Sequence, residues 1–238
     1  MHSLRTRASL CASALLGLAT LAGPAGGGLA RQAQQKPIRF GDIVISNFVR
    51  AEFELGNFTR AVGPNTTVDA VDPRQNTRAR IQAQSLTAYL VPKTSNRVDR
   101  IEATGNVRFS GTRAVPGGGT QTVRATGTRG VYNKLQEVLT LEGPVTFSAR
   151  QPAASGSGQE SVEGSAAKAV YDGAARVLTL SGKVQATVVT PDTPAEGSSF
   201  SGDEVRVEMA SRPYKVIVHN PSLEGKVNIR LRDESGKE

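Results

Sequence analysis

The sequence of 238 residues has little of what disulfide scaffolds and metal sites require, with one Cys, two His and no Trp. A single Cys excludes a disulfide framework and a thiolate metal cluster, and two His exclude most histidine-based metal sites. The chain also lacks GxSxG, Walker, HExxH and CxxC motifs, and its carboxylates show no evident acid/base pairing. We therefore expect no cofactor, no metal and no catalytic residue, so the protein is predicted not to be an enzyme. A jellyroll carbohydrate-active enzyme is disfavoured for the same reason.

Cations are in excess, because 29 Lys and Arg stand against 21 Asp and Glu and give a formal net charge of +8. A basic chain is compatible with nucleic-acid binding. Only 5% of the residues are aromatic, however, and no stacking platform is interleaved with the cations. Nucleic acid is therefore not expected as a partner.

The N-terminus has the pattern of a secretory signal. Residues 1–30 contain no Asp or Glu, and Arg5 and Arg7 precede an apolar run from Leu10 to Ala22 that small residues follow. The run is short for a membrane span, which needs about 20 apolar residues. We predict a signal peptide over 1–30 and an exported, periplasmic protein, with a retained anchor helix as the alternative. Removing these residues leaves one His, His219, which we expect to be structural or exposed.

An internal repeat of about 40 residues dominates the rest of the chain. Four segments carry a Gly with an apolar residue two positions before it and another two positions after it. The residue two positions after the Gly is Val in every copy. These glycines are Gly105, Gly143, Gly182 and Gly225. Alternation with period 2 predicts strands with one dry and one wet face. A Gly on the dry face predicts a kink or a close backbone approach.

A second repeated pattern precedes each of these strands, with apolar or small residues at offsets 0, 2, 5, 7 and 9. Its four copies are Ile81-Ala83-Leu86-Ala88-Leu90, Val123-Ala125-Thr128-Gly130-Tyr132, Val162-Gly164-Ala167-Ala169-Tyr171 and Phe200-Gly202-Val205-Val207-Met209. The step of three reverses the face of a regular strand, so a bulge or corner is predicted there. A helix is the competing interpretation for 77–90, but the other copies are too rich in Gly and β-branched residues for it.

The repeats predict an all-β protein: an elongated antiparallel β-jellyroll of two sheets folded over one another, built from repeated strand pairs, with 10–14 strands and almost no helix. A closed barrel or a β-helix is the alternative. We expect N-terminal strands with a degenerate first repeat over 31–78, the jellyroll repeats over 79–230, and a charged C-terminal tail over 231–238.

The two patterns together resemble the OstA/LptA-like family of periplasmic lipopolysaccharide-transport proteins. The matching segments are Arg80–Tyr89 with Arg100–Phe109, Thr122–Tyr132 with Val138–Phe147, Ser161–Tyr171 with Val177–Ala186 and, more loosely, Phe200–Ile229. The resemblance implies a taco-shaped jellyroll whose lining holds acyl chains of lipopolysaccharide or a related glycolipid. It also implies partners among related jellyroll domains of inner- and outer-membrane transport proteins, and head-to-tail assembly of this chain itself.

The lining of such a groove is predicted from the apolar positions of the repeats. The candidates for lipid binding are Ile101, Val107, Phe109, Leu139, Leu141, Val145, Phe147, Leu178, Leu180 and Val184. An ordinary packed core is the alternative for each of them, and it would suit a structural or adhesive β-repeat envelope protein that binds protein or polysaccharide. Candidate cations for lipid phosphates are Arg108, Arg124, Arg129, Lys168 and Lys183, with plain solvated charge as the alternative.

Overall fold

The computed structural model describes residues 35–73, 76–93, 97–115, 118–153, 158–191, 193, 197–210 and 214–219. The chain divides into two compact units, Met1–Ala33 and Gln34–Glu238, and all described residues belong to the second. The predicted signal peptide over 1–30, the glycine strand of the fourth repeat over 223–229 and the predicted tail over 231–238 lie outside the described residues.

Twelve strands make up the secondary structure of the described residues, in which no helix is present and hence none that could span a membrane. They are β1 (Ile38–Phe40), β2 (Ile43–Ser46), β3 (Arg50–Glu54), β4 (Phe58–Asp72), β5 (Thr77–Leu90), β6 (Val98–Ala114), β7 (Thr120–Asn133), β8 (Val138–Pro152), β9 (Gln159–Asp172), β10 (Val177–Val189), β11 (Ser198–Glu208) and β12 (Lys215–His219). The region 77–90 is therefore a strand, and the helical alternative is wrong.

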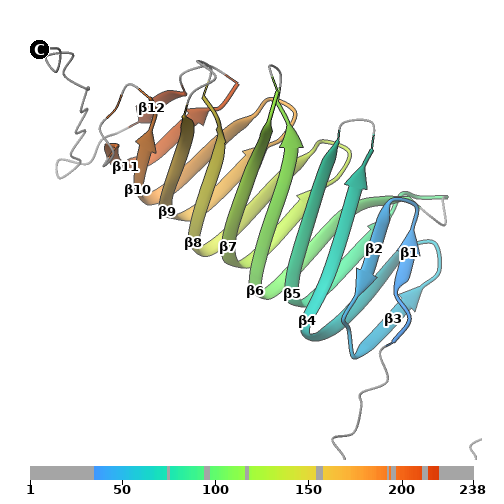
Figure 1. Cartoon of the computed structure of the whole chain (residues 1–238). Helices are drawn as coiled ribbons and strands as arrows, with labels where there is room; N and C mark the ends of the chain where they lie inside the picture. The colour runs from blue at the N-terminus through green and yellow to red at the C-terminus, as the bar shows by residue number, and fades with distance from the viewer. Residues whose placement is uncertain are drawn as a thin grey trace, which may run out of the picture. The chain divides into compact units, whose positions relative to one another are not determined.

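All twelve strands belong to one antiparallel sheet that follows the order of the sequence from β4 to β12, with β1 and β2 at one end and β3 beside β4. The long strands from β4 to β11 bend in the middle, so that the sheet folds into two facing layers along a common crease (Figure 1). The front layer contains Thr77–Gln82 of β5 and the segments that pair with it along the sheet, and the back layer contains Ser85–Leu90 and its partners. The predicted jellyroll is confirmed, and its two layers are halves of one sheet because the strands run through the crease.

The repeated glycines form this crease. Gly105, Gly143 and Gly182 have φ angles of +79°, +99° and +77°, which L side chains rarely adopt. The strand register shifts at each of them. The predicted kink is confirmed, but the predicted dry face is wrong: Gly105 and Gly143 are half-exposed and Gly182 is exposed. The bulge turns the glycine outward while the residues two positions to either side stay buried.

The corner predicted from the step of three is also present, because the register of β5, β7, β9 and β11 shifts at this step. The third position of the repeated pattern is buried in two copies, at Leu86 and Val205. It is exposed in the other two, so the burial predicted for Thr128 and Ala167 is wrong. The physical reason is the neighbouring glycine. A Cβ atom at Gly143 would lie 2.1 Å from Thr128 Oγ1, so Thr128 covers the crease from outside.

Replacing Gly143 with Ala is expected to lower the free energy of unfolding by about 1–3 kcal/mol, because the new Cβ meets both an unfavourable φ and the Thr128 side chain. Chemical denaturation measures the change. Ser148→Ala in the same strand is the control and is expected to change stability by less than about 0.5 kcal/mol. Equal effects of the two substitutions would show that the crease does not depend on the glycine.

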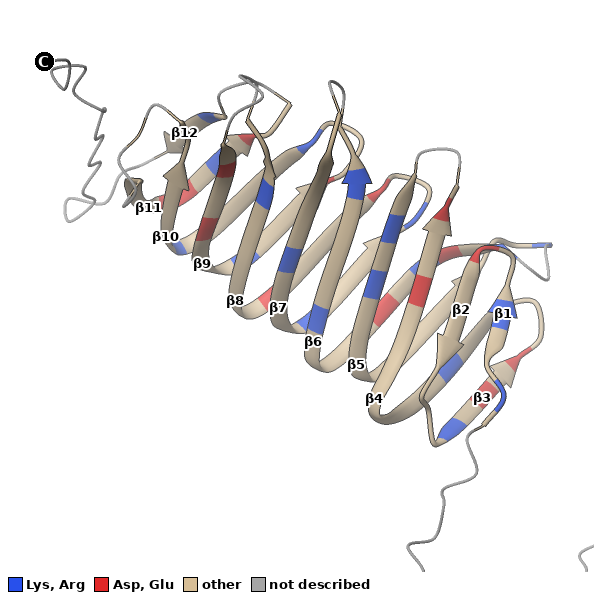
Figure 2. Cartoon of the chain, viewed as in Figure 1, with Lys and Arg blue, Asp and Glu red and all other residues tan. Residues whose placement is uncertain are grey.

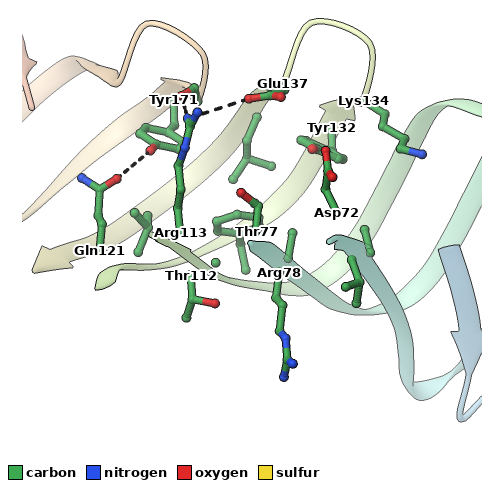
Figure 3. A pocket seen from close by; sticks show the side chains of 18 of the residues that line it. Asp72, Thr77, Arg78, Thr112, Arg113, Gln121, Tyr132, Lys134, Glu137 and Tyr171 are labelled. Atoms are coloured by element: carbon green, nitrogen blue, oxygen red, sulfur yellow. Dashed lines mark hydrogen bonds and ion pairs between the residues drawn. The ribbon is translucent and has the colours of Figure 1, made fainter. Parts of the chain in front are cut away.

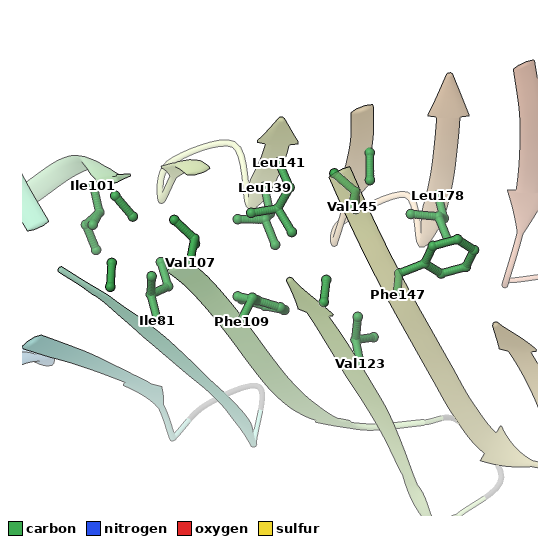
Figure 4. Close-up of a cluster of buried hydrophobic side chains, with 14 of the residues drawn as sticks. Ile81, Ile101, Val107, Phe109, Val123, Leu139, Leu141, Val145, Phe147 and Leu178 are labelled. Atoms are coloured by element: carbon green, nitrogen blue, oxygen red, sulfur yellow. The ribbon is translucent and has the colours of Figure 1, made fainter. Parts of the chain in front are cut away.

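The interior between the two layers holds one continuous cluster of buried hydrophobic residues. Side chains from different strands converge there, including Ile81, Phe109 and Val123 of the front layer and Leu139 and Leu178 of the back layer (Figure 4). Charged residues alternate with these positions and face outward. The sheet is thus a trough with an apolar inside and a charged outside.

Candidate functional site: the apolar trough and its mouth

The ten lining candidates all lie inside the trough, and none of them is more than 7% exposed. They differ in what surrounds them. Phe109, Leu139, Leu141, Phe147 and Leu178 line empty space between the layers. The remaining five line neither of the two hollows described below and are packed; they are Ile101, Val107, Val145, Leu180 and Val184. Lipid binding by any of the ten stays a prediction.

The larger hollow lies at the open side of the trough, opposite the crease, and contains about 820 Å³ of space, part of it open to solvent. Its front wall comes from the ends of β4 and β6 and the starts of β5 and β7. Its back wall comes from the end of β7 with the β7–β8 turn and from the end of β9 with the β9–β10 turn (Figure 3). We call this opening the mouth.

A second, much narrower hollow lies deeper between the layers, with free space for about one water molecule. It shares Val123, Leu139 and Tyr171 with the hollow at the mouth, so the two spaces adjoin along one wall. The other lining residues are almost all aliphatic or aromatic. The apolar wall of the mouth therefore continues into the interior behind it.

Charged residues bridge the rim of the mouth. Lys134 Nζ lies 2.5 Å from Asp42 Oδ1, and Arg113 Nη1 lies 3.9 Å from Glu137 Oε2. The Arg113 guanidinium also donates a hydrogen bond to the Gly173 carbonyl of the β9–β10 turn, and so connects the front layer to the back layer (Figure 3). These groups place polar atoms around an apolar opening, which suits a ligand with a polar head and apolar chains.

A buried polar network closes the open side of the trough next to the mouth. Gln121, Gln151 and Glu160 of the front layer are each at most 1% exposed. Tyr171 Oη donates to Gln121 Oε1 at 3.3 Å, and Gln151 Nε2 donates to Glu160 Oε2 at 2.9 Å. Arg176 of the β9–β10 turn donates to Gln151 Oε1 at 2.8 Å and thereby bridges the layers. Because buried polar groups are costly to separate, this network holds the layers together beyond the mouth.

Tyr132 lines the mouth, and burial, together with the negative charges of Glu137, Asp42 and Asp72, raises its pKa to about 12. A raised tyrosine pKa contributes stability that is complete below the unfolded pKa of about 10 and is lost as the pH rises through the folded value. We expect the free energy of unfolding to fall between about pH 10 and pH 12, by up to about 2 kcal/mol from this residue. Tyr132→Phe is expected to make the fall shallower in denaturation measured across that range. An unchanged slope would contradict the assignment to Tyr132.

The five predicted cations lie outside the trough, and none of them lines the mouth or the deeper hollow. Arg129 and Lys168 flank Glu142 at 3.8 and 3.4 Å on the back layer. Arg108 and Arg124 are exposed on the front layer, and Lys183 is exposed at the crease. Sequence reasoning missed the cations that do stand at the mouth, Arg113 and Lys134. Their contacts span 60 and 92 residues of sequence, so the repeat carries no signal for them.

The described residues hold no group of three or more His, Cys, Asp or Glu side chains that could bind a metal ion. His219 is exposed at the end of β12. The chemistry that the site offers is therefore the burial of apolar surface behind a polar rim.

A single sheet creased into a trough, with apolar space inside and charges at its mouth, defines an open β-jellyroll of the taco type. In comparisons with known families, residues 66–160 match the family described as "LptA/(LptD N-terminal domain) LPS transport protein". The match runs from β4 to the start of β9 and contains most of the mouth. The match supports the assignment of this part of the chain to the LptA/OstA-like family, and the resemblance drawn from the repeats is confirmed. Among curated proteins, no match is found.

The family assignment supports a role related to lipopolysaccharide transport in general, and a location in the cell envelope. The family consists of transport proteins without enzymatic activity.

Proposed function

We propose that this protein is a non-enzymatic periplasmic carrier that shelters the acyl chains of lipopolysaccharide, or of a related glycolipid, during transport to the outer membrane. The observation that carries the proposal is the unfilled apolar space inside the trough, which begins at the mouth and adjoins the deeper hollow. A core that served stability alone would be packed at nearly crystalline density. Here aliphatic side chains face empty volume at a charged rim.

The energetics of such binding are favourable. Burying a methylene group stabilises by about 0.8 kcal/mol, so a 12-carbon chain gains on the order of 10 kcal/mol before ordering costs. The guest's polar head would remain at the rim, where Arg113 and Lys134 offer cations and Asp42 and Glu137 set their positions. This arrangement supports a ligand that is apolar at one end and polar at the other.

The N-terminal end of the sheet supports assembly with related jellyroll domains of inner- and outer-membrane transport proteins, or with further copies of this chain. Among the described residues β3 pairs with β4 alone, so its other edge is open to strand addition. Phe53 on β3 and Leu55 just after it are 58% and 97% exposed. Exposed apolar residues beside an open strand edge suit a contact with another sheet.

The competing candidate is a structural or adhesive β-repeat protein whose interior is filled by its own side chains. The packing of Leu180, Val184 and the other fully enclosed lining candidates favours it for part of the trough. This alternative leaves the space at the mouth without a role.

Solvent extraction of the protein purified from lipopolysaccharide-producing cells, followed by mass spectrometry, tests the proposal. We expect acyl-chain glycolipid to co-purify, and the extracted protein to take up added lipopolysaccharide. Absence of lipid together with absence of uptake would contradict the carrier and support the packed-core protein.

A further inference from the structure

The outer face of the front layer carries a diagonal row of four arginines, one on each of four successive strands. They are Arg80 of β5, Arg108 of β6, Arg124 of β7 and Arg150 of β8. The strand register makes these arginines diagonal neighbours. Arg80 is opposite Ser110, two residues from Arg108, and Arg108 is opposite Thr126, two residues from Arg124. Arg150 is opposite Thr122, which is also two residues from Arg124. Such diagonal neighbours are about 7–8 Å apart. Figure 2 shows the blue positions stepping along these strands. We call this set the arginine row.

Carboxylates neutralise only the two ends of the arginine row. Arg80 Nε lies 2.6 Å from Asp69 Oδ1, and Arg150 Nη2 lies 2.8 Å from Glu163 Oε1. The two central residues, Arg108 and Arg124, are exposed and form no ion pair within the described part of the chain. Like charges at this spacing repel each other, so the centre of the row is a site where an external anion is favoured.

The outer face of the back layer differs in this respect. There Arg100 lies 3.2 Å from Glu102, and Glu142 stands between Arg129 and Lys168. The cations of these back-layer clusters therefore have a carboxylate beside them, while Arg108 and Arg124 at the centre of the arginine row do not.

The surroundings of the arginine row indicate which kind of partner fits it. Outward positions of the front layer on β5 to β8 carry Ser, Thr and Gln, and no Asp or Glu, as at Ser110, Thr126 and Ser148. Of the exposed large hydrophobic residues of the described chain, only Val71 lies on this face, on β4 opposite Arg78 and outside the strands of the arginine row. Protein interfaces centre on buried aromatic and apolar anchors, and β5 to β8 offer none on this face. A flat, hydroxylated, cationic sheet is complementary to a surface of many anions.

We propose that the arginine row docks the outer face of the front layer on a bilayer surface, through the phosphates of anionic lipid head groups. The contact is electrostatic and stays at the head-group level, because β5 to β8 carry no exposed large hydrophobic side chain on this face. It lies on the opposite side of the sheet from the trough, so it is independent of the proposed carriage of acyl chains.

Co-sedimentation of the whole protein with vesicles tests this docking. Vesicles of phosphatidylcholine containing phosphatidylglycerol serve as the anionic probe, and vesicles of phosphatidylcholine alone are the comparison. We expect binding to the anionic vesicles only, and a fall with rising salt. The double variant Arg108→Gln/Arg124→Gln is expected to bind roughly 30-fold more weakly. The double variant Arg100→Gln/Arg129→Gln changes the net charge equally on the other face and is expected to bind within about threefold of the unsubstituted protein.

Several results would overturn the proposal: no binding of the unsubstituted protein to anionic vesicles, equal losses in the two double variants, or unchanged binding of the Arg108→Gln/Arg124→Gln variant. Displacement by inorganic phosphate at matched ionic strength would also overturn it, since that result indicates a site for single phosphates. Lipopolysaccharide uptake, measured on the same variant, is expected to be normal. A failure of vesicle docking is thereby distinguished from a failure of the carrier function.

Discussion

Replacing Val123 with Trp is expected to reduce the loading of lipopolysaccharide by at least about tenfold, because the indole occupies the space where acyl chains would lie. Val123 lines both the mouth hollow and the deeper one and points into the interior (Figure 4). Excluding even two methylene groups from the trough removes about 1.6 kcal/mol of burial, which exceeds a tenfold change in affinity. Uptake of added lipopolysaccharide by the extracted protein measures the effect.

The fold is expected to tolerate this substitution, since the new side chain enters volume that is already empty. Val123→Ala is the matched control and is expected to keep its loading, because it enlarges the same space. A Val123→Trp protein with native stability and undiminished loading would show that the guest does not occupy the trough at this point.

The largest loss of stability is expected from Leu180→Ala, at about 3–5 kcal/mol in chemical denaturation. Leu180 is 0% exposed, pairs with Ala169 and Val205 on the neighbouring strands, and borders neither hollow. Truncation therefore opens a new cavity in a packed region. A loss of this size is a large fraction of the 5–15 kcal/mol that is typical of folded domains.

Leu139→Ala provides the comparison, because Leu139 already faces empty space in both hollows. The substitution removes fewer contacts, and we expect it to lower the free energy of unfolding by only about 2 kcal/mol. When loading is normalised to the amount of folded protein, the Leu180→Ala variant is expected to load lipopolysaccharide normally. Equal costs at the two positions would mean that the interior is packed uniformly, as in the structural alternative.

Much of the fold could be predicted from the sequence because the repeat encodes it locally. The period-2 alternation around Val107, Val145 and Val184 identified strands and their buried faces correctly. The step of three identified the corner at which each strand changes layer. These are relations between residues close in the chain, and the same pairing recurs along the sheet.

The details of the crease were not predictable from alternation alone. A strict period of two places Gly105 on the buried face, whereas its positive φ makes a bulge that turns it outward. Thr128 and Ala167 are exposed for a related reason, because each of them covers a neighbouring glycine from outside instead of filling the core. Periodicity describes regular strands and fails where the backbone leaves the β region.

The mouth escaped prediction for a different reason. Arg113 reaches the turn at Gly173, and Lys134 reaches Asp42, across sequence separations that no repeat of about 40 residues encodes. The distinction between packed and hollow-lining candidates, such as Leu180 and Leu141, is likewise invisible in the sequence, because both are Leu two positions before the repeated glycine. The distinction depends on how closely the two layers pack against each other at each position.

Site-specific photo-crosslinking is the most direct measurement of whether the trough holds a lipid. A photoreactive residue at Val123 faces the hollows, and one at Ser148 alternates with buried Phe147 and faces outward on the same layer. After loading with lipopolysaccharide, we expect a crosslinked adduct from Val123 and none from Ser148. Adducts from Ser148 alone, or from neither position while lipid remains bound, would place the lipid elsewhere and contradict the account.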